Sequence, residues 1–161
     1  MAGHIFITNP DSFEICKDRG LAGEAEHPHE KTNSELLARF ETLQKGDFVF
    51  FYVTKIQGIF GLWRVSNRPF YDNTPIWNLE NQLYPYRVCL EPYIRYFPRP
   101  INMSDIYDLM DKSKIWTFEL GKFGQSKNHH VITTEESKEI IRLLLRNNPI
   151  NVKVILFLLL S

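Results

Sequence analysis

The chain has 161 residues, with 19 lysines and arginines balanced by 19 aspartates and glutamates, and it contains two cysteines. This length fits a single domain that buries its own core. The zero net charge excludes the strongly basic kind of protein that coats nucleic acid regardless of sequence, and the two isolated cysteines give no support to a disulfide framework.

The N-terminal part of the chain predicts a strand followed by a helix. Residues 4–8 alternate in the manner of a strand, and Asn9 to Ser12 interrupt the alternation. Asp11 and Glu14 have the spacing of a capping box, which places the start of a helix there, and Gly20 is placed to end it. No secretion signal opens the sequence, so an intracellular, cytoplasmic protein is expected.

A polar segment then leads into a second predicted helix. Residues 20–23 are expected to form a loop, and Asn33 or Ser34 is placed to cap the helix, which residues 45–47 end. The apolar residues of this helix share one face: Leu36, Leu37, Phe40 and Leu43.

Residues 47–66 hold the most informative pattern, two aromatic-rich runs with a period of two that are joined by residues 55–58. This pattern predicts paired strands with Gly58 at the bend. Large rings fall on both parities of each run: Phe48, Phe50 and Tyr52 against Phe51 in the first, and Phe60 against Trp63 in the second. One face of the sheet is therefore expected to be core, and the other is expected to line a pocket for a flat ligand.

The second half of the chain predicts further strands and short helices. A loop at 67–81 carries Trp77, and residues 83–91 alternate as a strand. Ser104 is placed to cap a short helix that runs to Met110. Together these elements predict an α+β fold with a curved, mostly antiparallel sheet.

The C-terminal part predicts a final helix and an apolar tail. Residues 116–120 are expected to form a short element, and Thr133 and Glu136 have the spacing of a capping box. The apolar segment 150–161 is too short to cross a membrane as a helix, and it is interpreted as a buried strand, a contact with another chain or the start of a following domain. The domain itself is predicted to cover residues 1–149.

Catalytic and metal-binding motifs are missing from the sequence. It has no P-loop, no G-x-S-x-G turn and no H-E-x-x-H pair. His27 and His29 flank a proline, which suits a loop better than a metal site, and His129 has no cysteine or carboxylate nearby in sequence. Cys16 near a helix end lacks the setting that activates a thiolate. We therefore expect no catalytic residue, metal or cofactor.

Two features indicate binding, each with an alternative left open. Basic residues gather in the middle third of the chain, either as a patch for a few phosphates or as scattered solvated charges: Lys55, Arg64, Arg68, Arg87, Arg95 and Arg99. Trp77 lies in a polar loop, where it is either a wall that stacks on a base or a side chain folded over the core.

Three segments together resemble the EVE and YTH domains of the PUA-like superfamily: residues 5–21, residues 45–54 and residues 58–65. Residues 121–125 are similar to a turn of some YTH domains, and the resemblance spans residues 4–146. It implies a curved, barrel-like sheet flanked by helices. Members of these families take a modified base into an aromatic cage: YTH domains hold N6-methyladenine in RNA, and similar domains of prokaryotic restriction systems bind modified bases in DNA.

The resemblance also implies which residues contact the nucleic acid. Trp77 corresponds to a cage tryptophan. YTH domains place another around Leu21 and Ala22, where this chain has no aromatic residue, so the second wall is expected from Tyr52, Trp63 or Tyr84. The base edge is expected to contact Thr8, Asn9, Ser12 and the backbone of Leu21, Ala22 and Gly23. Phosphates are expected to contact Lys55, Arg64, Lys122 and Gln125.

Two functions follow. The first is a non-enzymatic reader that flips a modified base, N6-methyladenine in DNA, into the cage; RNA is the alternative polymer, and the expected partner is a nuclease or motor of a restriction system, with no membrane partner. The second is an amidohydrolase of the related ASCH type that acts on modified nucleosides and needs a lysine and a carboxylate in the pocket. Lys17 and Glu14 are the nearest pair, and their spacing also fits a surface ion pair.

Overall fold

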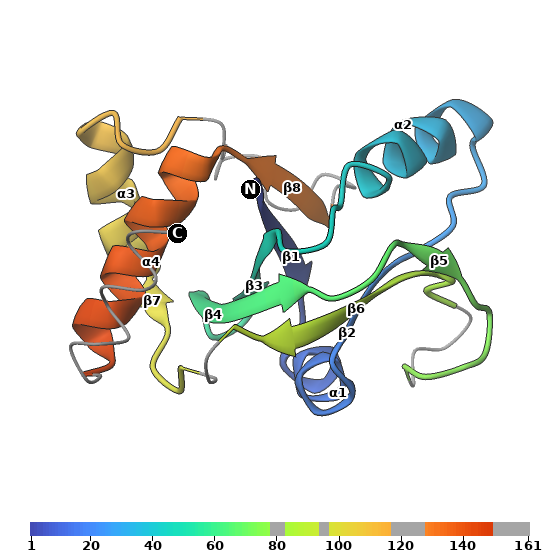
Figure 1. The fold of residues 1–161 in the computed structure, drawn as a ribbon, viewed down its shortest axis with the longest axis horizontal. Coiled ribbons are helices and arrows are strands. Elements are labelled where there is room, and N and C mark those ends of the chain that lie inside the picture. The colour runs from blue at the N-terminus through green and yellow to red at the C-terminus, as the bar shows by residue number, and fades with distance from the viewer. Residues whose placement is uncertain (78–82, 94–96, 117–127, 150–161) are drawn as a thin grey trace.

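A curved sheet forms the centre of the molecule (Figure 1); the computed structural model describes residues 1–77, 83–93, 97–116 and 128–149. The elements follow in the order β1 (Gly3–Thr8), α1 (Pro10–Arg19), β2 (Leu21–Glu24), α2 (Glu30–Phe40), β3 (Phe48–Val53), β4 (Gly58–Val65), β5 (Phe70–Tyr71), β6 (Tyr86–Pro92), β7 (Ile101–Asn102), α3 (Met103–Asp111), β8 (His129–Ile132) and α4 (Thr134–Asn147). The predicted α+β class is confirmed.

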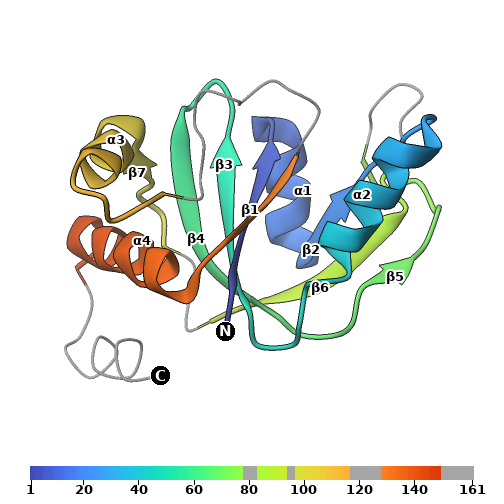
Figure 2. The same cartoon turned by 90° about the horizontal axis from the view of Figure 1, so that it is seen from above.

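The strands form one sheet in the order β2-β6-β4-β3-β1-β8, with β5 paired to β6 and β7 paired to β4. β1 is parallel to β3, with Ile5 opposite Phe50, and the other pairs among the described strands are antiparallel. Figure 2 shows α3 and α4 on one side of the central strands and α1 and α2 on the other. Both faces of the central strands are therefore covered, which explains why all of β3 is buried.

Each face of the sheet has its own apolar core. The core beneath α3 and α4 contains Phe48, Phe50 and Tyr52 of β3 together with Ile140 of α4. The core beneath α1 and α2 contains the alternate residues of β3 and apolar residues of both helices: Val49, Phe51, Val53, Phe13, Cys16 and Phe40. The face expected to line a pocket is thus mostly a second core.

Phe60 and Trp63 of β4 lie on the same face, whereas their parity in the sequence predicts opposite faces. Val49 pairs with Trp63 and Phe51 pairs with Phe60, so β4 has an extra residue at this point. Such a bulge shifts the alternation of the strand by one residue. Both rings therefore pack against Phe13 of α1, at centroid distances of 4.9 Å for Phe60 and 6.1 Å for Trp63.

Capping residues define the two ends of α1, which follows β1 directly. Asn9 is the N-cap, because its Oδ1 accepts a hydrogen bond from the Ser12 backbone N–H at 2.8 Å. The predicted capping role of Asp11 is wrong for this reason. Gly20 ends the helix as predicted, in the left-handed conformation with φ of 62°.

Residues 21–24 form the short strand β2, where a loop was expected over 20–23. β2 pairs with β6, and Gly23 lies opposite Arg87. A four-residue strand with a glycine has too little alternation to be recognised from sequence.

The starts of the remaining helices differ in how well the sequence predicts them. α2 begins at Glu30, and Asn33 lies within it, where its side chain accepts a hydrogen bond from the His27 backbone N–H at 3.0 Å. Asn102 precedes α3, so Ser104 lies inside the first turn and is not the cap. The capping box of α4 is confirmed by reciprocal hydrogen bonds between Thr133 and Glu136.

Several expectations fall partly or wholly outside the described residues. Trp116 lies outside the helices and strands, and residues 117–120 and the tail at 150–161 are not described. The same holds for Lys122 and Gln125. None of the helices that the structure describes has the length and apolar character needed to cross a membrane.

Candidate functional site

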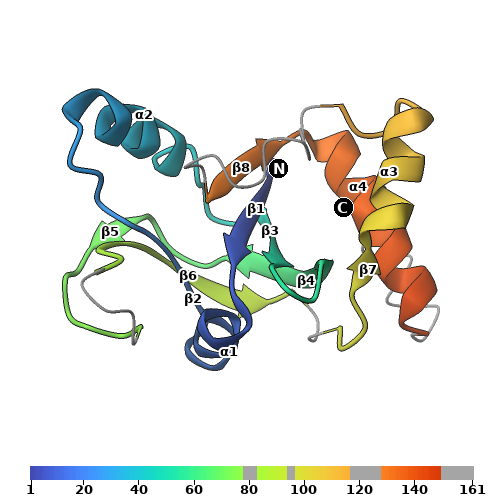
Figure 3. The same cartoon turned by 180° about the vertical axis from the view of Figure 1, so that it is seen from behind.

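A pocket of about 220 Å³ lies on the α1 side of the sheet, where β1 and β3 end. From behind, in Figure 3, α1 is seen beside β2 and β6, with α3 and α4 on the far side of β4. Ligand pockets for drug-sized molecules usually measure about 300–1,000 Å³. The pocket therefore suits one flat ring system better than a larger ligand. It is lined by Phe6, Ile7, Thr8, Asn9, Ser12, Cys16, Gly23, Phe51, Thr54, Trp77, Tyr84 and Asn128.

Trp77 and Tyr84, which lie between β5 and β6 in the sequence, form an aromatic wall of the pocket. Their ring centroids are 5.5 Å apart and their planes meet at 59°. Rings at this distance are in direct contact, so they form adjoining walls and leave no slot between them. Phe6 and Phe51 add rings from β1 and β3.

Gly23 allows the tryptophan to approach the sheet. A Cβ atom at this position would lie 2.8 Å from Cη2 of Trp77 and 3.1 Å from Cβ of Tyr84. Only a residue without a side chain fits between β2 and these two rings. Gly23 therefore sets how deeply Trp77 sits, and the indole is 7% exposed.

The polar part of the pocket comes from the junction between β1 and α1. Thr8, Asn9 and Ser12 line the pocket there, and Asn128 lines it from the residue before β8. The backbone N–H of Ile7 donates to the Asn128 carbonyl at 2.7 Å, which fixes the two segments side by side. The pocket thus combines aromatic rings with hydroxyl and amide groups that can bond the edge of a ring.

Cys16 lines the pocket but is not a nucleophile. Burial raises the pKa of its thiol to about 12, against a smaller opposing effect of a hydrogen bond with the Trp77 side chain. A thiol with this pKa stays protonated near neutral pH, and the thiolate is the reactive form. Cys16 therefore acts as a small apolar contact for the indole.

A buried carboxyl, Glu24, follows Gly23 on β2. Its Oε1 accepts hydrogen bonds from Asn128 Nδ2 and from the Ala25 backbone N–H, both at 3.3 Å, and its Oε2 has no hydrogen-bond partner among the residues that the structure describes. Burial raises the pKa of Glu24 to about 7. The carboxyl therefore holds its proton for much of the time near neutral pH.

The residues predicted for base binding fall into two groups. The structure brings one group together around the pocket: Thr8, Asn9, Ser12, Gly23, Trp77 and Tyr84. Leu21 and Ala22 precede Gly23 on β2 without lining the pocket, and Ala22 is fully buried in the core beneath α1.

Tyr52 and Trp63 are not walls of the pocket. Tyr52 belongs to the core beneath α3 and α4, because it has the parity of Phe48 and Phe50. Trp63 is 1% exposed and packs edge-on against Phe51, at a centroid distance of 5.2 Å. The sequence predicts both as walls because it does not show which aromatic rings pack into the two cores.

The predicted phosphate contacts are placed only in part. Lys55 is exposed in the turn directly after Thr54, and Thr54 lines the pocket. Arg64 of β4 forms an ion pair with Glu91 of β6 at 2.7 Å and does not line the pocket.

Sequence reasoning missed other lining residues. Phe6 and Phe51 lie at opposed positions of the parallel pair β1 and β3, so their shared face follows only from that register. Asn128 is distant in sequence and adjoins the pocket through β8. In the sequence, the only indication that Phe51 faces the pocket side is its parity in the strand, which is opposite to that of Phe50.

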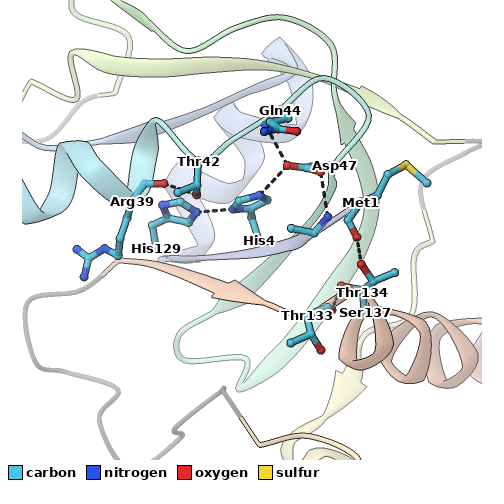
Figure 4. A network of polar contacts seen from close by, with 11 residues as sticks. Met1, His4, Arg39, Thr42, Gln44, Asp47, His129, Thr133, Thr134 and Ser137 are labelled. Atoms are coloured by element: carbon cyan, nitrogen blue, oxygen red, sulfur yellow. Dashed lines mark hydrogen bonds and ion pairs between the residues drawn. The ribbon is translucent and has the colours of Figure 1, made fainter.

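His4, His129 and Asp47 form a buried chain of polar groups (Figure 4). His4 bonds His129 through its Nδ1 at 2.9 Å and Asp47 through its Nε2 at 3.1 Å. Both imidazoles are at most 1% exposed, and burial lowers the pKa of each. This chain of polar groups joins β1, β8 and the segment before β3. His129 also stacks on Phe6 at a centroid distance of 4.5 Å.

The pair required by the amidohydrolase hypothesis lies on the surface. Lys17 Nζ and Glu14 Oε2 form an ion pair at 2.6 Å, and the Glu14 side chain is 59% exposed. Neither residue lines the pocket. In the part of the chain that the structure describes, no cluster of histidine, cysteine and carboxylate residues suits a metal ion.

Comparisons with known proteins agree with this fold. The family model of the EVE domain matches residues 3–143. The structure is similar to human THYN1 in complex with DNA containing 5-methylcytosine, with 16% identity, 89% of this chain and 98% of that chain covered, and a TM-score of 0.59. It is also similar to a protein from Leishmania major, with 11% identity, 91% and 96% coverage and a TM-score of 0.62.

A further similar structure is the YTH domain of Zygosaccharomyces rouxii MRB1 in complex with N6-methyladenosine RNA, with 16% identity, 88% and 86% coverage and a TM-score of 0.50. At these identities the solved structures show the fold alone. A search of curated proteins finds no match. The predicted PUA-like architecture of the EVE and YTH type is confirmed.

Proposed function

Because the chain belongs to the EVE domain family, we propose that it binds nucleic acid by taking one modified base into the pocket beside Trp77 and Tyr84. The observation that carries this proposal is the composition of the pocket, with aromatic rings next to hydroxyl and amide groups and no charged side chain among its described lining residues. A flipped base loses its stacking in the duplex and regains it on aromatic side chains, while polar groups satisfy its edge.

The proposed ligand is N6-methyladenine in DNA. THYN1 was solved with 5-methylcytosine DNA and the MRB1 YTH domain with N6-methyladenosine RNA, so both bases and both polymers belong in the test. A methyl group in an apolar pocket contributes about 1–3 kcal/mol, which limits the preference for a methylated base to roughly 5- to 150-fold. Lys55, next to Thr54 of the pocket lining, is the proposed contact for a neighbouring phosphate.

The proposed function is binding without catalysis. The described lining residues of the pocket include no activated nucleophile, since Cys16 keeps its proton, and the pair Lys17 and Glu14 lies on the surface. A nuclease or motor subunit of a restriction system remains the predicted partner. An amidohydrolase is the competing function, and turnover of a methylated nucleoside that survives Trp77→Ala would support it.

The test measures fluorescence anisotropy of single- and double-stranded DNA and RNA oligomers at one fixed salt concentration, because phosphate contacts make affinity depend on salt. Each oligomer is compared with and without one N6-methyladenine or one 5-methylcytosine. We expect tighter binding of a methylated oligomer and loss of that preference in Trp77→Ala.

Trp116→Ala is the matched control, because Trp116 is 55% exposed and does not line the pocket. It should bind like the unsubstituted chain. Trp77 is buried, so its removal can also lower stability; Tyr84→Ala repeats the test on a less buried wall residue. Equal affinity for methylated and unmethylated oligomers across the whole set would refute the proposal.

A further inference from the structure

Arg87 is a buried cation next to the pocket, and it takes no part in the pocket lining. Its side chain is 1% exposed and lies on β6 opposite Gly23. A buried guanidinium is costly unless its donors are satisfied. The partners that satisfy Arg87 therefore indicate what it stabilises.

These partners all belong to the loop that carries Trp77. Arg87 Nε donates to the Tyr84 carbonyl at 2.8 Å and Nη2 donates to the Thr74 carbonyl. Nη1 forms an ion pair with Asp72 Oδ2 at 3.2 Å, without a hydrogen bond to any residue that the structure describes. The backbone N–H of Asp72 donates to the Pro85 carbonyl at 2.8 Å, which closes the loop at its base. A planar guanidinium can direct its donors to several fixed acceptors at once, so one side chain holds both ends of the loop.

The same guanidinium lies over the ring of Trp77, with 5.4 Å between its Cζ and the ring centroid. A cation over an aromatic face is attracted by the electron density of the ring. That density is then drawn toward Arg87, and less remains to attract a second cation brought against the indole from the pocket. Repulsion between the two positive charges adds to this effect, because a site shielded from water screens charges weakly.

No lining residue of the pocket that the structure describes carries a negative charge to compensate a cationic ligand, since none of them is an aspartate or glutamate. Glu24, the buried carboxyl on β2, is bonded to Asn128, and burial raises its pKa to about 7, so it is only partly ionised near neutral pH. Aromatic cages that bind cations depend on the opposite arrangement, with electron-rich ring faces open to the ligand.

We propose that Arg87 is a positioning residue for the Trp77 wall and that its charge restricts the pocket to modified bases that are uncharged. This inference rests on the proposed function, since it concerns the base bound in the same pocket. It separates two classes of methylated base that have the same number of non-hydrogen atoms and differ by one proton. N6-methyladenine and 5-methylcytosine are neutral at neutral pH, whereas their isomers 1-methyladenine and 3-methylcytosine are cations.

The experiment measures the affinities of isomeric single-stranded DNA oligomers at neutral pH, N6-methyladenine against 1-methyladenine and 5-methylcytosine against 3-methylcytosine. The unsubstituted chain should favour the neutral isomer of the pair that it binds. Arg87→Met removes the charge, and it should reduce this preference roughly thirtyfold, since a desolvated cation–π contact has about that effect on an equilibrium constant. Arg87→Gln gives the same readout without charge if Arg87→Met does not fold.

Two further variants separate charge from position. Arg87→Lys keeps the charge but cannot reach Tyr84, Thr74 and Asp72 together, so it should weaken binding of both isomers and keep their ratio. Asp72→Asn keeps the charge of Arg87 and its two carbonyl bonds and removes only the ion pair, so it should weaken binding of both isomers less than Arg87→Lys does and keep their ratio. Near-UV circular dichroism of the tryptophans verifies that each variant is folded.

The two proposals fail in different ways. An unsubstituted chain that binds neutral methylated, cationic methylated and unmethylated oligomers equally contradicts the proposed function itself. A chain that prefers a neutral methylated base, but keeps its preference over the cationic isomer unchanged in folded Arg87→Met or Arg87→Gln, overturns the role of Arg87 alone. Equal weakening of both isomers in these uncharged variants would also overturn the charge effect.

Discussion

Gly23→Ala is expected to displace the aromatic wall of the pocket without unfolding the chain. The added Cβ would lie 2.8 Å from Cη2 of Trp77, and ordinary contacts begin at 3.4 Å, so the indole must move by about 0.6 Å. Tyr84 must move as well, because its Cβ would lie only 3.1 Å away. Overpacking of this kind costs about 1–3 kcal/mol of stability. Alanine suits a strand at least as well as glycine, so the backbone opposes the change little.

The effect on binding should be larger than the effect on stability implies. Stacking of a base on an aromatic ring contributes about 1–3 kcal/mol, and a displaced Trp77 loses part of it, so affinity for the methylated oligomer should fall roughly tenfold. Anisotropy titrations measure this change, and urea unfolding measures stability in parallel.

Gly58→Ala is the matched control for that comparison. Its Cβ would lie 2.9 Å from Cβ of Pro100, a similar overlap next to β7 and away from Trp77. It should lower stability by a similar amount and leave the preference for a methylated base intact. Unchanged preference in Gly23→Ala, or an equal loss in Gly58→Ala, would refute the view that Gly23 sets the position of the wall.

Further predictions concern stability. Burial raises the pKa of Glu24 from 4.5 to about 7, so the folded chain binds the extra proton and the free energy of unfolding falls as pH rises through this range. Glu24→Gln should remove that fall and gain up to about 3 kcal/mol at neutral pH, as measured by urea unfolding at several pH values. In this variant, stability should instead be lost as pH falls below 6.5, because burial lowers the pKa of His4 and His129 in the folded chain; a flat pH profile would contradict this. Thr133→Ala should cost about 1 kcal/mol through loss of the capping box of α4, and an unchanged urea midpoint would contradict it.

Much of the fold follows from local patterns in the sequence. β3 and β4 are recognised because their aromatic alternation is strong, and α4 is recognised because Thr133 and Glu136 satisfy backbone groups within one turn. These signals depend on neighbouring residues only. These elements can therefore be recognised without knowing which strands pair in the sheet.

The parts that were missed depend on contacts between distant segments. β2 is a strand because β6 pairs with it, although the two are more than sixty residues apart in sequence. The face of Trp63 depends on an extra residue in β4, which only the pairing with β3 reveals. In the sequence, Arg87 is one of several basic residues in the middle third of the chain. Its burial depends on hydrogen bonds to the carbonyl groups of a loop, and the sequence shows only that this loop is polar.

The candidate site could be predicted where the same residues also serve the fold. Thr8, Asn9 and Ser12 stood out as the end of a strand and the start of a helix, and that junction is where the pocket opens. Trp77 stood out as a large ring in a polar loop. The composition of the remaining walls required the packing of both cores.

The helix cap also limits how Asn9 can recognise a base. Its Oδ1 accepts the hydrogen bond of the Ser12 N–H at 2.8 Å, so the group of Asn9 that the cap does not use is its amide NH2, a donor. Adenine N1 and cytosine N3 accept hydrogen bonds on the Watson–Crick edge, whereas guanine N1 and thymine N3 carry protons. A donor that meets this ring nitrogen therefore favours modified adenine and cytosine over modified guanine and thymine, and it does not separate adenine from cytosine. Asn9→Asp tests this step, because its carboxylate keeps the cap and has no donor: α1 should remain stable while affinity for the methylated base falls, and unchanged affinity would show that Asn9 serves the helix alone.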